Sequence, residues 1–278
     1  MRSALYVPGD RPDMLAAARA RGADALIVDL EDAVPMPAKE AARAAVAAWL
    51  GTLPPDTDLP PRATRIWVRV NPGPLGSLDL NAVALPAVAG VCLAKTESAA
   101  DVAEVDRLLA DAPRIAVNPL LESAAAILAA PEIARAPRVA RLQVGEADLC
   151  ADLGVTPGRD ERELLWARSQ VVLASAAAKI APPLAPVRTD FRDLAALRTS
   201  TEALKRLGFH GRACIHPAQL AVVHEVFTPT AGQLAEARDL LARFESSPSG
   251  IVLDPAGRMV DAAVIRHARR TLGEGQSG

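Results

Sequence analysis

Eight short apolar segments alternate with alanine-rich stretches along the 278 residues, and this order predicts an α/β fold. Two further observations favour a closed (β/α)8 TIM barrel. Most of the apolar segments are almost continuously hydrophobic, as in parallel strands that are covered on both faces. An open doubly wound sheet is the alternative, but no Gly-x-Gly-x-x-Gly motif follows the first segment, and the sequence contains no Walker-type loop.

The expected strands begin close to the N-terminus. They lie at residues 3–7, 25–30, 65–70, 90–93, 114–120 and 139–144, with weaker candidates at 184–187 and 212–215. The stretches between them, such as residues 11–21, 37–50 and 99–110, are rich in Ala, Leu, Arg and Glu, which favour helix. Residues 51–64 contain four prolines and are expected to form a loop.

A second segment that breaks the pattern, residues 246–257, is rich in Ser, Pro and Gly and follows the eight expected strands. Residues 261–272 beyond it are expected to form one more helix. We therefore expect two parts: a barrel formed by residues 1–245 that carries the site, and a C-terminal helical extension formed by residues 246–278.

The composition limits the classes of function. Half of the residues are hydrophobic and 23% are charged, as in soluble globular proteins. The formal net charge of −2 argues against nucleic acid as a main partner. No apolar run reaches the roughly 18–20 residues that span a bilayer, and Pro8, Gly9 and Asp10 come too early for a signal peptide. The three cysteines form neither a metal-binding pattern nor an even disulfide framework, so we expect a cytoplasmic protein.

Polar and charged residues follow seven of the eight expected strands at their carboxyl ends. The main ones are Asp10, Arg11, Asp29, Glu31, Asp32, Arg69, Asn71, Lys95, Glu97, Glu122, Glu146, Asp148 and His216. In a barrel these strand ends converge on one rim, where the catalytic residues of this fold lie. One charged residue after a strand carries little meaning, but repetition around the rim with both signs of charge indicates a site.

Glu122 and Asp148 follow neighbouring expected strands. Two such carboxylates can share a hard cation such as Mg²⁺, which prefers oxygen ligands and keeps several waters. The alternative is that each is an acid in the first turn of a helix, where the helix dipole favours it. Arg69 lies within an apolar strand, and there it either binds a substrate carboxylate or forms a structural ion pair with Asp29 or Glu31. The spacing leaves both alternatives open in each case.

Nine short motifs succeed one another along nearly the whole chain, among them Tyr-Val-Pro-Gly-Asp-Arg and Gly-Glu-Ala-Asp-Leu. They lie at residues 2–11, 22–34, 68–71, 95–98, 121–124, 145–149, 189–193, 214–219 and 257–261. Each motif alone is modest. By their number, order and spacing they resemble the HpcH/HpaI aldolase and citrate lyase β-subunit family, in its citrate lyase β-like branch.

The resemblance implies a (β/α)8 barrel, assembled as a homotrimer or hexamer, that cleaves or forms a carbon–carbon bond next to an acyl thioester. Substrates of this kind are citryl-CoA, citramalyl-CoA and malyl-CoA, which yield an acyl-CoA and a 2-keto acid. It implies that Glu122 and Asp148 hold Mg²⁺ or Mn²⁺ and that Arg69 binds the substrate's carboxylate. It also implies that Asp261, on a C-terminal segment that reaches a neighbouring subunit, acts as acid or base.

The resemblance further implies a cleft for the CoA thioester. The residues expected to bind substrate there are Tyr6, Pro8, Arg11, Glu31, Asp32, Arg69, Lys95 and His216. Arg11 is the candidate phosphate contact. The alternation of side chains along the second strand separately predicts a supporting structural role for at least one of Asp29, Glu31 and Asp32.

Three positions depart from the family pattern. Ser123 replaces a common Thr, and Ala147 replaces a residue that is often polar. Ala185 replaces a usual Asp, which leaves the acyl group and the reaction open. Two other activities therefore remain alternatives: a pyruvate-dependent aldolase that uses free aldehydes without CoA, and a citrate lyase β subunit that works only with its acyl-carrier partner.

Overall fold

The computed structural model describes residues 1–246, 252–253, 259–260 and 262–277. The chain divides into two compact units, Met1–His224 and Glu225–Gly278. The second unit begins at Glu225 and not at the expected residue 246, because helix α11 (Ala231–Ser246) packs along helix α12 (Ala262–Ser277).

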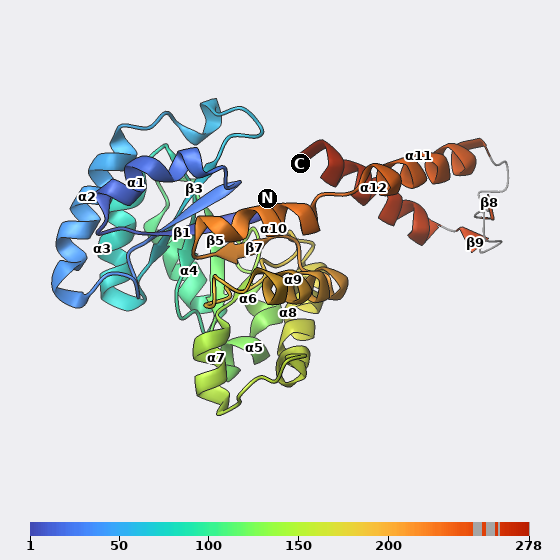
Figure 1. Ribbon diagram of the computed structural model, residues 1–278. Helices are drawn as coiled ribbons and strands as arrows, with labels where there is room; N and C mark the ends of the chain where they lie inside the picture. The colour runs from blue at the N-terminus through green and yellow to red at the C-terminus, as the bar shows by residue number, and fades with distance from the viewer. Residues whose placement is uncertain (247–251, 254–258, 261, 278) are drawn as a thin grey trace. The chain divides into compact units, whose positions relative to one another are not determined.

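The first unit is built on a curled parallel sheet whose strands pair in the order β6-β5-β4-β3-β2-β1-β7 (Figure 1). These strands are β1 (Ser3–Pro8), β2 (Ala25–Asp29), β3 (Arg65–Val70), β4 (Val88–Leu93), β5 (Ala116–Leu121), β6 (Gln143–Val144) and β7 (Arg212–Cys214). Every pairing between them is parallel. The predicted α/β fold with a parallel sheet is confirmed.

The seventh expected strand, residues 184–187, does not form a regular strand in the structure. It appears as two isolated parallel bridges, Gln143 with Leu184 and Ala185 with Arg212, which link β6 at one edge of the sheet with β7 at the other. Three prolines among residues 182–186 explain the reduction, because proline has no backbone N–H to donate to a ladder.

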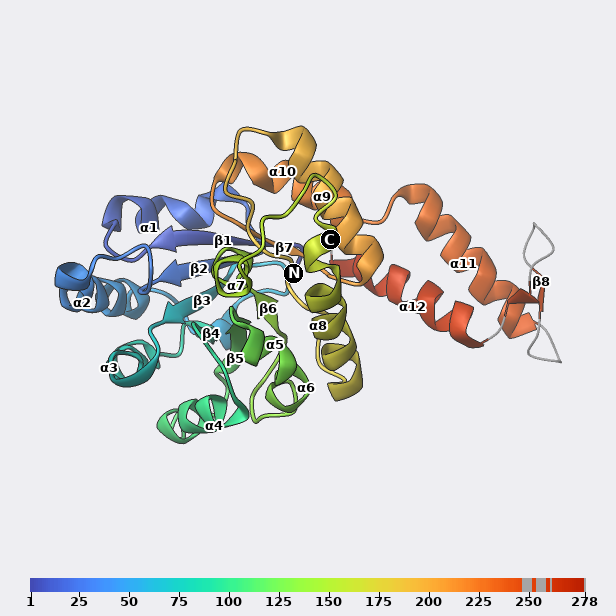
Figure 2. The same cartoon turned by 90° about the horizontal axis from the view of Figure 1, so that it is seen from below.

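Helices connect the strands and pack around the outside of the sheet (Figure 2). They are α1 (Pro12–Ala18), α2 (Lys39–Gly51), α3 (Gly73–Val83), α4 (Ala99–Leu108), α5 (Ala124–Leu128), α6 (Ala130–Ile133), α7 (Glu146–Leu153), α8 (Leu165–Ala178), α9 (Leu194–Leu207) and α10 (Leu220–Phe227). The expected helices at 11–21, 37–50 and 99–110 correspond to α1, α2 and α4. Ser98 and Asp101 form a capping box that begins α4.

One buried cluster of the curled sheet combines small side chains, such as Ala4 and Ala25, with larger ones, such as Ile27 and Leu120. The ring of Trp67 packs against that cluster and lies over Gly90. A Cβ at Gly90 would lie only 2.3 Å from Trp67 Cζ3, so no other residue fits at that position. The interior of the curled sheet is therefore packed at this level.

The second unit contains α11, α12 and a short antiparallel pairing of β8 (Val252–Leu253) with β9 (Met259–Val260). The expected terminal helix at residues 261–272 corresponds to α12, which begins at Ala262. Its packing on a neighbouring subunit stays a prediction. Among the described residues, no helix combines the length and the apolar character that crossing a bilayer requires.

Candidate active site

A cavity of about 410 Å³ opens at the carboxyl ends of the strands in the first unit. Six of the residues predicted for the site line it, namely Tyr6, Pro8, Asp32, Arg69, Glu122 and Asp148. Its other polar lining residues are Asp29, Gln143 and Glu146, and its apolar ones include Ala33, Leu120, Val144, Ala147, Val187 and Ile215. The cavity therefore lies where barrel enzymes carry their chemistry.

Glu122 directly follows β5 and is only 7% exposed. Its Oε2 accepts a hydrogen bond of 2.8 Å from the backbone N–H of Lys95. Its Oε1 faces Gly145, where a Cβ would come within 2.3 Å of that oxygen. Burial raises the pKa of Glu122 to about 7, and the charges of Glu31 and Asp148 add to this rise. The surroundings of Glu122 therefore supply too little positive charge to stabilise its ionised form.

Asp148 lies in the first turn of α7 and is exposed to the cavity. Its neighbour Glu146 is engaged by Arg168, through hydrogen bonds of 2.5 Å from Nε and 2.7 Å from Nη2. No hydrogen bond or ion pair of Asp148 is found within the described part of the chain. Of the two acids in this turn, Asp148 is therefore the one left to bind a ligand.

The pair of carboxylates fits a hard divalent cation. Glu122 is buried with one oxygen that accepts no hydrogen bond from the described residues, and Asp148 shares its cavity. No group of three or more His, Cys, Asp or Glu side chains suited to a metal occurs among those residues. The protein would supply two ligands and leave the rest to water and substrate, which is the usual arrangement for Mg²⁺.

Arg69 projects from β3 and is surrounded by acids. Its Nε and Nη2 donate to the two oxygens of Asp29, at 2.7 and 2.5 Å, and its Nη1 lies 2.9 Å from Glu31 Oε2. Burial lowers the pKa of Arg69, but the hydrogen bonds and charge of Asp29 outweigh it and raise that pKa. The structural ion pair considered from the sequence is therefore present, while the guanidinium still lines the cavity.

Lys95 lies two residues after the end of β4 and has a left-handed conformation, with φ +50°. Its Nζ forms an ion pair with Glu31 Oε1 and lies 3.6 Å from Asp32 Oδ1. Glu31 is 5% exposed, and burial raises its pKa. Lys95 thus acts on the cavity in two ways: its backbone holds Glu122, and its side chain holds the acidic loop that surrounds Arg69.

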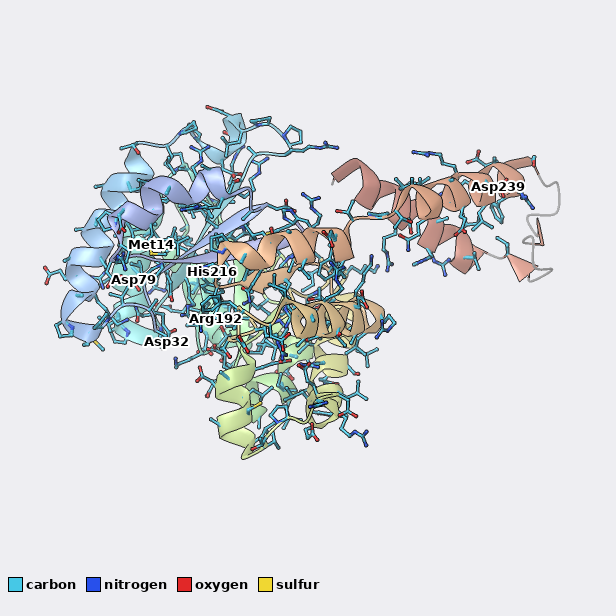
Figure 3. All side chains as sticks on the ribbon, viewed as in Figure 1. Met14, Asp32, Asp79, Arg192, His216 and Asp239 are labelled. Carbon is cyan, nitrogen blue, oxygen red and sulfur yellow. The ribbon has the colours of Figure 1, made fainter. Side chains whose placement is uncertain are left out.

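Besides Glu31 and Lys95, which hold the acidic loop, two predicted residues lie outside the lining of the cavity. Arg11 is exposed and pairs with Asp13 at 3.0 Å. His216, labelled with Asp32 in Figure 3, begins a short 3₁₀ turn, where its Nδ1 accepts from Ala218 N–H and its ring stacks on Phe191 at 4.5 Å. Asp261 lies outside the described residues. The roles of all three stay predictions.

Ala185 does not face the cavity. It is fully buried and packs with Leu204 and Phe209. Its bridge partner Arg212 is also buried and donates to hydroxyls of α9, and no carboxylate lies within ion-pair distance of it in the part of the chain that the structure describes. Burial lowers the pKa of Arg212 to about 10, and its Nε has no partner. An Asp at position 185 would therefore act on Arg212 and not on the substrate.

We expect Ala185→Asp to leave the free energy of unfolding within about 1 kcal/mol of the parent and the substrate preference unchanged, because Arg212 would neutralise the new carboxylate. In an Arg212→Met background the same change should lower that free energy by roughly 3–5 kcal/mol. Urea unfolding measures both effects. A changed substrate preference in Ala185→Asp would show that this position acts on the site.

Sequence reasoning missed Asn118 of β5 and Gln143 of β6. Asn118 is buried beneath the cavity and Gln143 lines it. Both are polar residues inside mostly apolar expected strands, which is the signal that drew attention to Arg69. The same criterion applied to every expected strand would have found them.

Comparison with known proteins places these residues in context. Residues 2–217 match the family model HpcH/HpaI aldolase/citrate lyase. The chain is 36% identical over 281 residues to a citrate lyase subunit beta-like protein of Deinococcus radiodurans, covering 98% of this chain and 96% of that one. It is 34% identical over 280 residues to a (3S)-malyl-CoA thioesterase of Cereibacter sphaeroides, covering 99% and 95%.

Solved structures resemble the chain at a similar level of sequence identity. The structure of protein CitE from Mycobacterium tuberculosis in complex with magnesium, acetoacetate and coenzyme A has a TM-score of 0.80 and 35% identity, and it covers 99% of this chain and 100% of that one. A citrate lyase beta subunit from the same organism, complexed with oxaloacetate and magnesium, has a TM-score of 0.69 and 35% identity, covering 82% and 97%.

Proposed function

The chain belongs to the HpcH/HpaI aldolase/citrate lyase family, and from this premise we propose that it is a Mg²⁺-dependent lyase of 3-hydroxyacyl-CoA thioesters. It cleaves, or in reverse forms, the bond between an acyl-CoA and a 2-keto acid, with citryl-CoA, citramalyl-CoA and malyl-CoA as candidate substrates. The observation that carries the proposal is that Glu122, Asp148 and Arg69 line one cavity.

Each of these side chains has a task in that reaction. Glu122 and Asp148 would hold the ion, which when bound polarises the oxygen of the 2-keto acid half. Arg69, held in place by Asp29 and Glu31, orients the carboxylate of the same half. Asp32, which lies beside Lys95, would meet the thioester arm, and Tyr6 and Pro8 form part of the lining.

Two further parts of the proposal rest mainly on the family. Asp261 supplies the acid or base to the site of a neighbouring subunit, so that the active enzyme is a homo-oligomer. The sheet is a (β/α)8 barrel in which residues 184–185 act as the reduced strand, and the bridges of Leu184 and Ala185 to β6 and β7 support this.

The test is a panel of the three thioesters, each assayed with Mg²⁺ and with EDTA, in which both the 2-keto acid and free CoA thiol are measured. We expect the 2-keto acid to form with Mg²⁺ and no thiol to be released. Thiol release without 2-keto acid would replace the lyase by a thioesterase. Activity only on free hydroxy-keto acids would indicate an aldolase, and activity only after addition of an acyl-carrier protein would indicate a subunit of a complex.

The affinity for Mg²⁺ should fall as the pH falls below about 7. Because the pKa of Glu122 is raised to about 7, the metal-free protein holds a proton there at lower pH, and each ion that binds must displace it. The dissociation constant should therefore rise about tenfold per pH unit below 7 and be nearly constant above it. Calorimetric titration with MgCl₂ measures this, and an affinity independent of pH would contradict it.

A further inference from the structure

Three polar side chains lead from the interior of the sheet to the cavity. Asn118 Nδ2 donates to Gln143 Oε1 at 3.1 Å, and Gln143 Nε2 donates to the hydroxyl of Tyr6 at 3.1 Å. Below them, Asn118 also donates to the sulfur of Cys92 at 3.6 Å. Such a chain of hydrogen bonds has a direction, because an amide donates only through nitrogen and accepts only through oxygen.

The direction of the chain determines what the Tyr6 hydroxyl can do. Its oxygen accepts from Gln143, so its own hydrogen must point elsewhere, and no acceptor for that hydrogen is found among the described residues. Burial raises the pKa of Tyr6 above its ordinary value of 10.0, so the hydroxyl stays protonated. Tyr6 lines the cavity, and its hydrogen is therefore available to a ligand there.

Few other side chains of the lining can donate. They are Arg69 and Gln143, and the guanidinium of Arg69 is already assigned to the carboxylate of the 2-keto acid half. Gln143 uses its amide to hold Tyr6. A neutral donor also suits an oxygen that carries no charge in the substrate and becomes negative during the reaction.

We infer that the hydroxyl of Tyr6 donates a hydrogen bond to the thioester oxygen of the substrate, with Gln143 and Asn118 as positioning residues. The inference rests on the proposed lyase function. In cleavage, the hydroxyl proton on C3 passes to a base, the C2–C3 bond breaks, and its electron pair moves to the acyl half as a thioester enolate. The C3 half becomes the 2-keto acid, and the enolate carbon then takes up a proton. The thioester oxygen gains charge only as the bond breaks, so a preset donor lowers the barrier.

The test compares Tyr6→Phe, Gln143→Glu and the double variant. Tyr6→Phe should lower kcat by about 10²–10³-fold with a change in KM below about threefold. In Gln143→Glu the new carboxylate accepts the hydrogen of the Tyr6 hydroxyl and turns it away from the cavity. This variant should therefore show a similar loss of kcat. The double variant should lose no more than Tyr6→Phe alone, whereas two independent structural defects would multiply. Gln233→Glu, the same change at an exposed glutamine, should keep kcat within about twofold of the parent.

A second readout separates this inference from the lyase proposal. Exchange of the methyl protons of acetyl-CoA in D₂O with Mg²⁺ reports enolate formation without carbon–carbon cleavage. If the parent exchanges but does not cleave, the lyase proposal fails, and slower exchange in Tyr6→Phe still supports the donor. Unchanged kcat and exchange in Tyr6→Phe, or additive losses in the double variant, overturn the donor. A parent that neither cleaves nor exchanges overturns both.

Discussion

Glu122→Gln should lower lyase activity by at least about 10³-fold while the protein remains folded. The change keeps the shape of the side chain and its acceptor for Lys95 N–H, but it removes the charge that a cation needs. Metal polarisation contributes several kcal/mol to a reaction of this kind, which corresponds to a loss of that size. Asp148→Asn should behave in the same way.

The free energy of unfolding distinguishes loss of the metal from loss of the fold. Burial disfavours the charged form of Glu122, so its neutral replacement should unfold in urea at the same or a slightly higher concentration than the metal-free parent. Glu132→Gln is the matched control, because Glu132 is an exposed acid in the first turn of α6 and does not line the cavity. Full activity of Glu122→Gln, or of the parent in EDTA, would contradict the metal site.

The sequence predicts the fold well where the apolar segments are long. β1 to β5 are five or six residues long and mostly apolar, and all five were expected as strands. It predicts the region from residue 139 to 187 less well, because the pairing there shrinks to β6 and three isolated bridges, and prolines remove donors around residues 184 and 185. The boundary between the two units was also missed, since the packing of α11 on α12 is a contact between helices that composition does not reveal.

The candidate site was likewise predicted only in part. Strand ends predicted which residues meet, because parallel strands place their carboxyl ends on one rim. They offered the ion pair of Arg69 with Asp29 or Glu31 as one of two alternatives and did not decide between them, since Asp29 and Arg69 are 40 residues apart and meet only through the register of β2 and β3. Nor did they show that position 185 faces α9 and not the cavity, because a one-residue change of register reverses the face of a strand.

Arg69→Met should lower the free energy of unfolding by roughly 3–5 kcal/mol, because it leaves the buried carboxylate of Asp29 without its cation. The same variant should lower kcat/KM by at least about 10³-fold, since the substrate's carboxylate loses its partner. The single variant alone cannot separate these effects, because a distorted acidic loop would also impair the site.

The double variant Arg69→Met/Asp29→Asn separates the two roles of the arginine. Replacing both members of a buried pair removes the unpaired charge, so most of the lost stability should return. Activity should not return with it, because the carboxylate of the substrate still has no guanidinium to bind. Recovery of kcat/KM together with stability would instead mean that Arg69 serves only to hold Asp29 and Glu31. The measurement therefore decides between the two interpretations of Arg69 that its sequence position leaves open.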